Sequence, residues 1–488
     1  MTTPLPGLPA HRAGSVPLAL RDDWEQLSMG DRAAFLARRV AAGRWAYGAQ
    51  EAWQRGRPWQ PMRPLVIAHR DYEALGAVAE RLLRLAVDAC RRRAGTVGEL
   101  REVMRDRCPQ RLLTPDRPLE HDEVLRVARP DVLLCRGVPK FLELNISATI
   151  YGIPALDRMA DAYARLWPGA ALSAPTPVLG ARSALLAALM SRRSGPGGRL
   201  LVPTWRSRVG QAAKLGNRRA LRAYLRPTVE SATSAGLDVV VEDLSRLRTD
   251  EHGRLQAGGK RVDMVLNWFH SWMITDDSGG VDAIAAALAA GTVELFLPET
   301  MRLLRSKEIL AWLYEDLDLL PAEDRDLVLS HVPWTAWAGP QQSRTDRDSV
   351  VRRALRDRAD LVLKPANEGS GRGVVFGADL DSDSWRALVT ESARQGTVVV
   401  QRRVEGDTVR MPFLDPSSGA QCDLRVPYVL SPFLVGGRIC GALVRHVGPD
   451  RTGGRVINLG AGALANTTLL TAWTHDRRIT DTAGSSTG

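Results

Sequence analysis

The segment that most constrains the fold is an apolar strand followed by a lysine and three closely spaced glycines, LVLKPANEGSGRGV at residues 361–374. Glycines without a Cβ let backbone N–H groups approach phosphate oxygens, and a lysine ammonium is a point charge suited to such an oxygen. No Gly-Lys-Ser/Thr follows, as a Walker loop requires, and the glycine spacing is not that of a dinucleotide-binding turn. The segment therefore predicts either a phosphate-binding loop at Lys364 or a plain glycine-rich turn between two strands.

The chain has 488 residues, which suits roughly two to four domains, and its 44% hydrophobic and 25% charged residues are typical of a soluble globular protein. No apolar stretch approaches the roughly 20 residues that cross a bilayer, and residues 1–20 contain Pro and Arg in place of the apolar run of a signal peptide. We therefore expect a cytoplasmic protein without a membrane partner. The cysteines are scattered without metal-ligand spacing and are expected to be reduced: Cys90, Cys108, Cys135, Cys422 and Cys440.

The formal charge of +11 would suit a nucleic-acid partner, so this alternative has to be weighed. Arginines supply almost all of the cations and are spread along the chain, with no basic tail and no aromatic-interleaved run. A basic enzyme that acts on a polyanionic nucleotide needs no further explanation. We therefore expect no nucleic-acid partner.

Hydrophobic periodicity predicts a mixed α/β chain. Helical spacing recurs over residues 31–57 and 72–93, and two short apolar runs at 132–134 and 141–145 predict a β-hairpin. Residues 175–298 alternate short strands with helices such as 218–235, which predicts a parallel sheet. A helix over 305–314, a loop up to about residue 347, and mostly strands with glycines from residue 360 are expected to follow.

Three further segments continue in the order of a nucleotide-binding half: residues 400–404 at the end of an apolar run, 436–445, and the glycine-rich 458–462. A Glu-x-Asn strand is absent after them and occurs near the front instead, as Glu143-Leu144-Asn145 behind Arg129-Pro130-Asp131. This order resembles a circularly permuted ATP-grasp ligase of the eukaryotic glutathione synthetase type. The resemblance spans roughly residues 129–470, and the motifs that carry it are short.

The resemblance implies an α/β (α+β) ATP-grasp fold, circularly permuted, with an inserted subdomain. Its expected parts are a helical N-terminal region (1–128), a segment with the metal-binding strand (129–165), an α/β substrate-binding subdomain (166–298), a nucleotide-binding region with a glycine-rich lid (299–475) and a disordered tail (476–488).

Side chains alternate along a strand, so Glu143 and Asn145 are expected to share one face and to bind an ion together. Mg²⁺ takes one or two carboxylates together with phosphates and water, which makes Glu143, Asn145 and Glu368 the predicted metal ligands. The alternative for Glu143 is a solvent-facing acid on an edge strand. ATP and Mg²⁺ are the implied cofactors.

The resemblance also assigns nucleotide and catalytic roles. Nucleotide-binding positions are Lys307, Lys364, Gly369, Ser370, Gly371, Gln401, Arg402 and Val404, where the segment around Gln401 would recognise the base through its backbone. The implied catalytic residues are Arg129, Lys364 and Arg445. They would stabilise phosphoryl transfer from ATP to a carboxylate, and an amine would then attack the acyl phosphate. The loop 453–462 would close over the site as a lid.

At the substrate the sequence departs from glutathione synthetase, because an arginine and a tyrosine expected after the strand at 262–266 are absent. We expect another amide ligation, in specialised metabolism, whose pocket is lined by Ser147, Thr149, Asn267, Trp268 and His270. The expected partners are a small carboxylate and an amine, with a homodimer by analogy. The alternatives are a glutathionylspermidine-synthetase-like polyamine ligase and a non-catalytic ATP- or peptide-binding protein.

Overall fold

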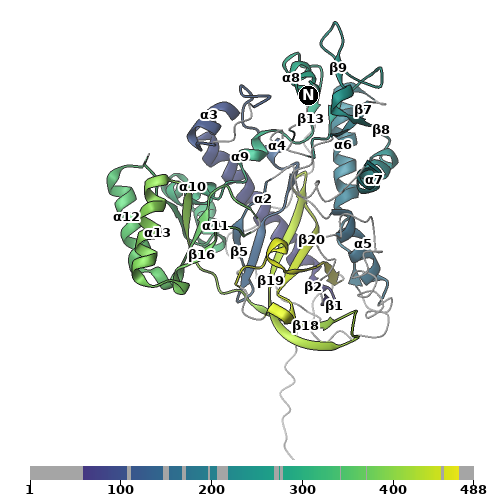
Figure 1. Cartoon of the computed structure of the whole chain (residues 1–488). Helices are drawn as coiled ribbons and strands as arrows, with labels where there is room; N and C mark the ends of the chain where they lie inside the picture. Colours follow the sequence, from purple (N-terminus) through teal and green to yellow (C-terminus); the bar gives the residue numbers. More distant parts are fainter. Residues whose placement is uncertain are drawn as a thin grey trace, which may run out of the picture.

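The computed structural model describes residues 59–106, 112–146, 153–166, 172–195, 198–205, 218–268, 274, 279–340, 342–369, 371–451 and 455–471. The predicted helix over 31–57 and the tail 476–488 lie outside these residues. The described chain is mixed α/β, as the sequence predicts, and its strands form several separate sheets (Figure 1).

The central sheet is antiparallel and joins strands from the front and the back of the chain. Its strands are β1 (Gln60–Pro61), β3 (Val127–Ala128), β4 (Asp131–Cys135), β5 (Val138–Glu143), β18 (Thr408–Leu414), β19 (Gln421–Val435), β20 (Arg438–His446) and β21 (Leu464–Asn466). Leu430 of β19 pairs with Val132 of β4, and both side chains belong to the main core beneath helix α2 (His69–Arg91). The opposite face of these strands is therefore free to line a site.

The predicted hairpin is confirmed, because β4 and β5 pair antiparallel. The register contains a bulge: Asp131 lies opposite Glu143, whereas Val132 lies opposite Phe141. Leu142 is therefore an extra residue at the end of β5. Such bulges re-aim side chains, and they recur beside functional sites.

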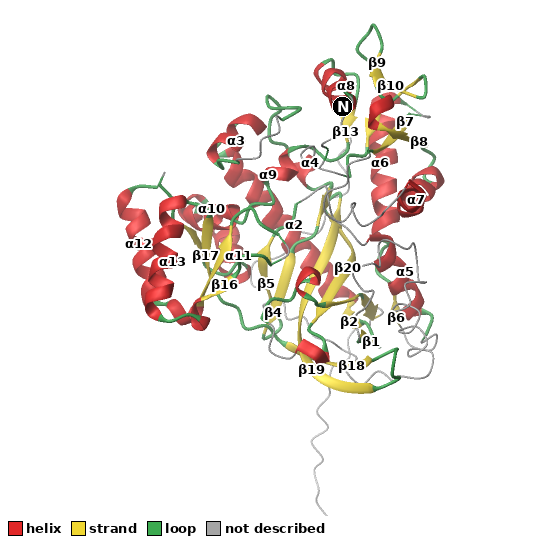
Figure 2. Ribbon diagram, viewed as in Figure 1, coloured by secondary structure: helices red, strands yellow, loops and turns green. Residues whose placement is uncertain are grey.

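A smaller antiparallel sheet lies beside the central sheet (Figure 2). It consists of β14 (Thr335–Trp337), β15 (Leu361–Pro365), β16 (Val375–Phe376) and β17 (Val398–Arg402). Helices α12 (Arg344–Arg356) and α13 (Ser382–Gln395) cover its outer face, where Leu361, Leu363 and Val400 pack around Trp385. Because side chains alternate along a strand, Lys364 and its neighbours in register point to the other face.

Part of this region differs from the sequence-based expectation. The predicted loop up to residue 347 contains α11 (Ala322–His331), β14 and the start of α12, and α13 interrupts the predicted run of strands. The capping signal of α13 is present in the sequence: the Asp381 carboxylate accepts two N–H groups of the first turn, and Gly396 ends the helix in the left-handed conformation. Charged residues dominate these short helices, which weakens the apolar stripe that would reveal them.

A third sheet is parallel and confirms the parallel sheet expected within residues 175–298. Its strands, in the spatial order β13-β12-β7-β8, are β7 (Arg199–Thr204), β8 (Asp238–Asp243), β12 (Met264–Val265) and β13 (Glu294–Leu295). The accompanying helices are α6 (Val178–Ser194), α7 (Arg218–Ser234) and α8 (Gly280–Ala289). Short antiparallel strands extend from it: β9 (Arg248–Thr249), β10 (Leu255–Ala257) and β11 (Lys260–Arg261).

The remaining elements tie the two ends of the described chain together. Strand β2 (Leu65–Ala68) pairs parallel with β22 (Thr468–Thr471), which also pairs with β6 (Leu172–Ser173). The other helices are α3 (Val97–Val103), α4 (His121–Val124), α5 (Ile153–Ala164), α9 (Thr300–Leu303) and α10 (Glu308–Glu315). Short 3-10 turns occupy Leu244–Arg246, Leu317–Leu319, Arg358–Asp360, Gly377–Asp379, Pro449–Arg451 and Leu459–Ala461. The described helices include no candidate for a membrane span.

Candidate active site

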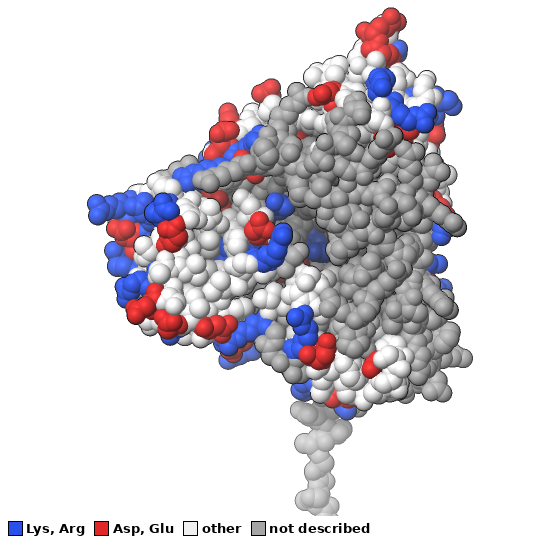
Figure 3. Space-filling view, viewed as in Figure 1, with Lys and Arg blue, Asp and Glu red and all other residues white. Residues whose placement is uncertain are grey.

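A cavity lies between the small sheet and the central sheet, and Figure 3 shows the molecule hollowed there beside charged side chains. The central sheet contributes Asp131 of β4, Val429 of β19 and Arg445 of β20, while the small sheet contributes Lys364 of β15 and Gln401 of β17. The charged side chains on its wall include three cations and three acids that the two sheets and their loops bring together: Lys307, Lys364, Arg445, Asp131, Glu143 and Glu368.

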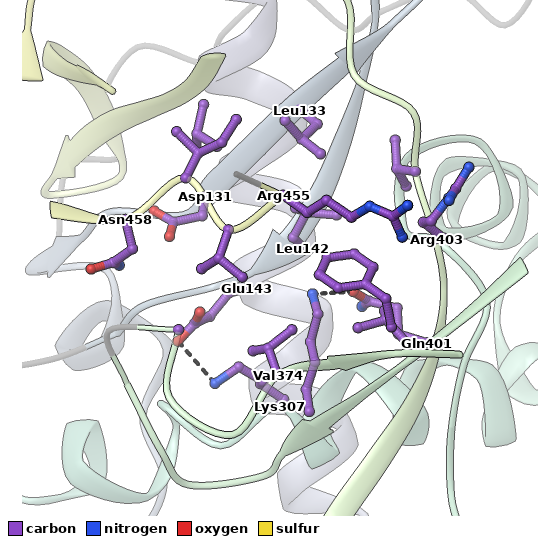
Figure 4. Close-up of a pocket in the computed structure, with 18 of the residues that line it drawn as sticks. Asp131, Leu133, Leu142, Glu143, Lys307, Val374, Gln401, Arg403, Arg455 and Asn458 are labelled. Carbon is purple, nitrogen blue, oxygen red and sulfur yellow. Dashed lines mark hydrogen bonds and ion pairs between the residues drawn. The ribbon is translucent and has the colours of Figure 1, made fainter. Parts of the chain in front are cut away.

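Lys307 lies at the start of α10 and contacts two predicted metal ligands, Glu143 at the end of β5 (Figure 4) and Glu368 in the glycine-rich segment. Its Nζ is 3.2 Å from the Glu143 carboxylate and donates to the backbone carbonyl of Glu368 at 2.7 Å. Its backbone N–H donates to the carbonyl of Ala366, which fixes the helix start against the glycine-rich segment. The Lys307 ammonium is therefore paired with the Glu143 carboxylate, which the sequence predicts to be a metal ligand.

Lys364 points into the cavity from β15, and its Nζ donates to the Gln401 side-chain carbonyl at 2.5 Å. The pKa of Lys364 is lowered to about 8, chiefly by burial. Glu143 and Asp131 oppose this shift, and Lys307 adds to it. The Lys364 ammonium is therefore poorly solvated, and an anion brought into the cavity would be attracted strongly.

Arg445, Asp131 and Ser431 form a closed cluster on the central sheet. Nη2 of Arg445 is 2.7 Å from the Asp131 carboxylate and donates to the Ser431 hydroxyl at 2.8 Å, and that hydroxyl donates to Asp131 at 2.9 Å. Burial would raise the pKa of Asp131, but Arg445 and Arg129 outweigh it and hold the pKa below its usual value. Arg129 acts on this carboxylate through its charge alone, so Arg129 and Arg445 together outnumber the one acid, Asp131, and leave positive charge here.

The glycine-rich segment meets the C-terminal residues 455–458 across the cavity. Gly371 has φ of +72°, and a Cβ there would come within 2.4 Å of a Val456 methyl group. Arg455 pairs with Asp379 at 2.5 Å and lies over the Phe376 ring. Only glycine permits this close approach, and the contact brings residues 455–458 of the predicted lid onto the cavity wall.

Apolar side chains line the rest of the cavity: Leu133, Leu142, Val362, Val374, Phe376, Val404 and Val429. Leu142 is the extra residue of the β5 bulge, which is how it lines the cavity alongside its neighbour Glu143. The backbone of residues 401–404 passes beside this apolar part. Such a slot can hold a flat aromatic ring, while the charged part can hold phosphates.

The structure places most predicted site residues on the cavity wall: Lys307, Lys364, Gly371, Gln401, Arg402, Val404, Glu143, Glu368 and Arg445. Arg129 and Gly369 lie outside the lining residues; the Arg129 guanidinium is behind the wall, near Asp131 and over the Phe433 ring. Lining residues to which the sequence reasoning gave no role of their own include Asp131, Phe376 and Arg455, the last of which lies in the predicted lid. Asp131 had a signal, since it stands in the Arg-x-Asp strand ahead of Glu143.

Asn145 is not on the cavity wall. Strand β5 ends at Glu143, and Asn145 has φ of +43°, so the two-residue alternation assumed for these side chains stops before it. Its backbone carbonyl accepts the Arg129 N–H instead. The shared strand face predicted for Glu143 and Asn145 is therefore wrong.

Asn267 and Trp268 also lie off the cavity wall, and both have structural partners. Asn267 is buried, and its side-chain amide makes two hydrogen bonds with the backbone of Leu297. It donates to the Leu297 carbonyl and accepts the Leu297 N–H. The Trp268 indole donates to the Pro203 carbonyl and its ring stacks at 4.7 Å from that of Trp205. The other predicted positions, Ser147, Thr149, His270 and Ser370, lie outside the described residues.

A magnesium ion at the cavity would take its protein ligands from the carboxylates on the wall. The described residues contain no group of three or more His, Cys, Asp or Glu side chains that could hold a metal on their own. Mg²⁺ at nucleotide sites usually takes one or two carboxylates and completes its shell with phosphates and water. Glu143 and Glu368 supply two carboxylates, which fits that requirement. Each is paired with a cation, Glu143 with Lys307 and Glu368 with Arg372, and Lys307 also donates to the backbone carbonyl of Glu368.

Comparison with known proteins gives a fold but no family. No family model and no curated protein matches this sequence. A glutathione synthetase-like effector from Globodera pallida, in its apo form, is 12% identical and superposes over 90% of this chain and 96% of its own with a TM-score of 0.57. D-alanyl-alanine synthetase A from Vibrio cholerae is 11% identical over 56% of this chain and 89% of its own, with a TM-score of 0.28. The chain thus shares its fold with the effector.

Proposed function

We propose that the chain is an ATP- and Mg²⁺-dependent ligase that joins a carboxylate to an amine through an acyl phosphate, on an amino acid or small peptide. The observation that carries the proposal is the cavity itself, where Lys307, Lys364 and Arg445 meet Glu143 and Glu368 beside an apolar slot. A polyanionic nucleotide needs cations at its phosphates and an apolar surface at its base. The fold shared with a glutathione synthetase-like protein supports the same proposal.

In this proposal the adenine lies in the slot formed by Val362, Val374 and Phe376, and its edge meets the backbone of residues 401–404. The phosphates extend toward Lys364 and Lys307. Glu143 and Glu368 would hold magnesium, which would neutralise charge on the phosphate oxygens. Lys307 pairs with one oxygen of the Glu143 carboxylate, so the other oxygen would be available to the metal.

The reaction consists of two transfers. A carboxylate oxygen of the first substrate bonds to the γ-phosphorus while the bond to the ADP oxygen breaks. The amine nitrogen of the second substrate then bonds to the acyl carbon, inorganic phosphate leaves with the bridging oxygen, and the amine loses a proton to solvent. Arg445, held by Asp131 and Ser431, supplies positive charge beside the acyl phosphate, and Lys364 stabilises the charge that develops on the leaving ADP.

The donor and acceptor are not assigned to described residues, because Asn267 and Trp268 serve the fold around β12 and not the cavity. Ser147, Thr149 and His270 remain the proposed substrate positions. Ser147 and Thr149 follow Glu143 closely in the sequence, and this proximity along the chain is the reason for proposing them.

The proposal is tested by ADP release from ATP and Mg²⁺ with pools of amino acids, small peptides and amines. Release should require a carboxylate and an amine together, and it should be lost in Lys364→Met and in Glu143→Gln. Lys260→Met is the matched control, because Lys260 is exposed on β11. ATP binding without any acceptor-dependent ADP release would favour a non-catalytic binding protein, and release with polyamines alone would favour a polyamine ligase.

A further inference from the structure

Three polar side chains form a hydrogen-bonded row across the cavity face of the small sheet. Thr335 of β14 lies opposite Gln401 of β17 in register, and Gln401 lies opposite Val362 of β15. Lys364, two residues beyond Val362, is the diagonal neighbour of Gln401 and points to the same face. Thr335 is fully buried and Gln401 is 1% exposed, so solvent cannot replace any bond between them.

The direction of each hydrogen bond in the row follows from the chemistry of its ends. The Thr335 hydroxyl donates to the backbone carbonyl of Pro333 at 2.8 Å, which leaves its oxygen as an acceptor. The Gln401 amide nitrogen donates to that oxygen at 2.9 Å. The side-chain carbonyl of Gln401 must therefore point the other way, where it accepts the Lys364 ammonium at 2.5 Å. Swapping the two ends of the amide would set donor against donor at Lys364 and acceptor against acceptor at Thr335.

An amide at this position holds the ammonium without neutralising it. A carboxylate would form an ion pair with Lys364 and neutralise the charge that attracts a phosphate. The carbonyl of Gln401 is uncharged, so it orients the ammonium without neutralising it. The charged groups that act on Lys364 are Glu143, Asp131 and Lys307. Burial lowers the pKa of Lys364, which is consistent with an ammonium that has no carboxylate bonded to it.

We propose that Gln401 and Thr335 are positioning residues, which aim the Lys364 ammonium at the phosphates of the bound nucleotide and keep its charge available. The inference rests on the proposed nucleotide-binding function and extends it. It gives the side chain of Gln401 a role, where the sequence assigned only its backbone. If these residues position Lys364, removing either hydrogen bond should weaken binding of the phosphates of ATP and should leave binding of the adenine base unchanged.

The test compares the affinities of wild-type protein and variants for MgATP and for adenosine by isothermal titration calorimetry. Gln401→Leu should raise the Kd for MgATP at least about tenfold, since a hydrogen bond to a charged group is lost, and should leave the Kd for adenosine within about twofold. Thr335→Val should reproduce this pattern and Thr335→Ser should restore wild-type affinity. Gln395→Leu, at an exposed position at the end of α13, is the matched control.

Gln401→Glu covers the case in which the leucine variant does not fold, because it keeps the shape of the side chain and its contact with Lys364. The Thr335 hydroxyl would have to turn from the Pro333 carbonyl to donate to the new carboxylate. Gln401→Glu should weaken MgATP binding by a similar factor, since the new carboxylate pairs with the ammonium. Wild-type affinity for MgATP in the leucine and glutamate variants would overturn the inference alone, as would an equal loss for MgATP and adenosine. A wild-type protein that binds no ATP would overturn the proposed function and the inference with it.

Discussion

The pKa of Lys364 makes nucleotide binding dependent on pH in a window where few groups titrate. Burial lowers this pKa to about 8, so about nine-tenths of the molecules carry the ammonium at about pH 7 and about one-tenth at about pH 9. Bound phosphates favour the protonated form, so the apparent Kd rises as the competent fraction falls. The Kd for MgATP should therefore increase by about tenfold between these two pH values.

The assay is calorimetry of MgATP binding across this pH range, with Lys364→Arg as the decisive variant. A guanidinium stays charged throughout, so the variant should bind with an affinity that hardly changes with pH, whatever its absolute value. Lys260→Arg on exposed β11 should keep the pH dependence of the wild type. An equally steep loss of affinity in Lys364→Arg and wild type would refute the reasoning, because another group would then carry the titration.

Three further predictions concern the walls of the cavity and its surroundings. Gly371→Ala should weaken MgATP binding because its Cβ would collide with Val456, whereas Gly419→Ala, with a similar φ of +75° and open space, should cost only backbone strain in thermal unfolding. Asp131→Asn should lower the free energy of unfolding, measured by urea denaturation, by about 3–5 kcal/mol, because buried Arg445 loses its carboxylate partner. Asp423→Asn, which removes a half-exposed pair with Arg410, should lower it by at most about 1 kcal/mol. Trp268→Phe should lower the free energy of unfolding by about 1 kcal/mol through loss of the bond to the Pro203 carbonyl, and a changed Kd for MgATP without lost stability would contradict its structural role.

Local sequence signals were sufficient for several elements of the fold. Apolar runs of strand or helix length predicted the β4–β5 hairpin, helix α7 and the parallel sheet. In each of these elements the apolar residues repeat with the period of the structure that they form. Helix α13 was missed although its Asp381 cap and its Gly396 end are readable, because glycine-rich neighbours dominated the interpretation. Circular permutation, the inserted subdomain and the domain boundaries remain proposals.

The site was predictable to the extent that its residues lie in strands. Lys364 and Glu143 were found from their motifs, and both line the cavity. The prediction for Asn145 failed because strand β5 ends at Glu143, two residues earlier. The positive φ of Asn145 cannot be predicted from the presence of an asparagine alone. The row of Thr335, Gln401 and Lys364 could not be foreseen, since it depends on the register of three strands drawn from distant segments.

The central claim is that the carboxylate attacks the γ-phosphorus and becomes an acyl phosphate. It is tested most directly with a donor whose carboxylate carries ¹⁸O, once ADP release has identified a substrate pair. The account predicts that one labelled oxygen appears in each inorganic phosphate released, because the bridging oxygen departs with phosphorus when the amine attacks. Unlabelled phosphate, or release of AMP and pyrophosphate, would contradict it.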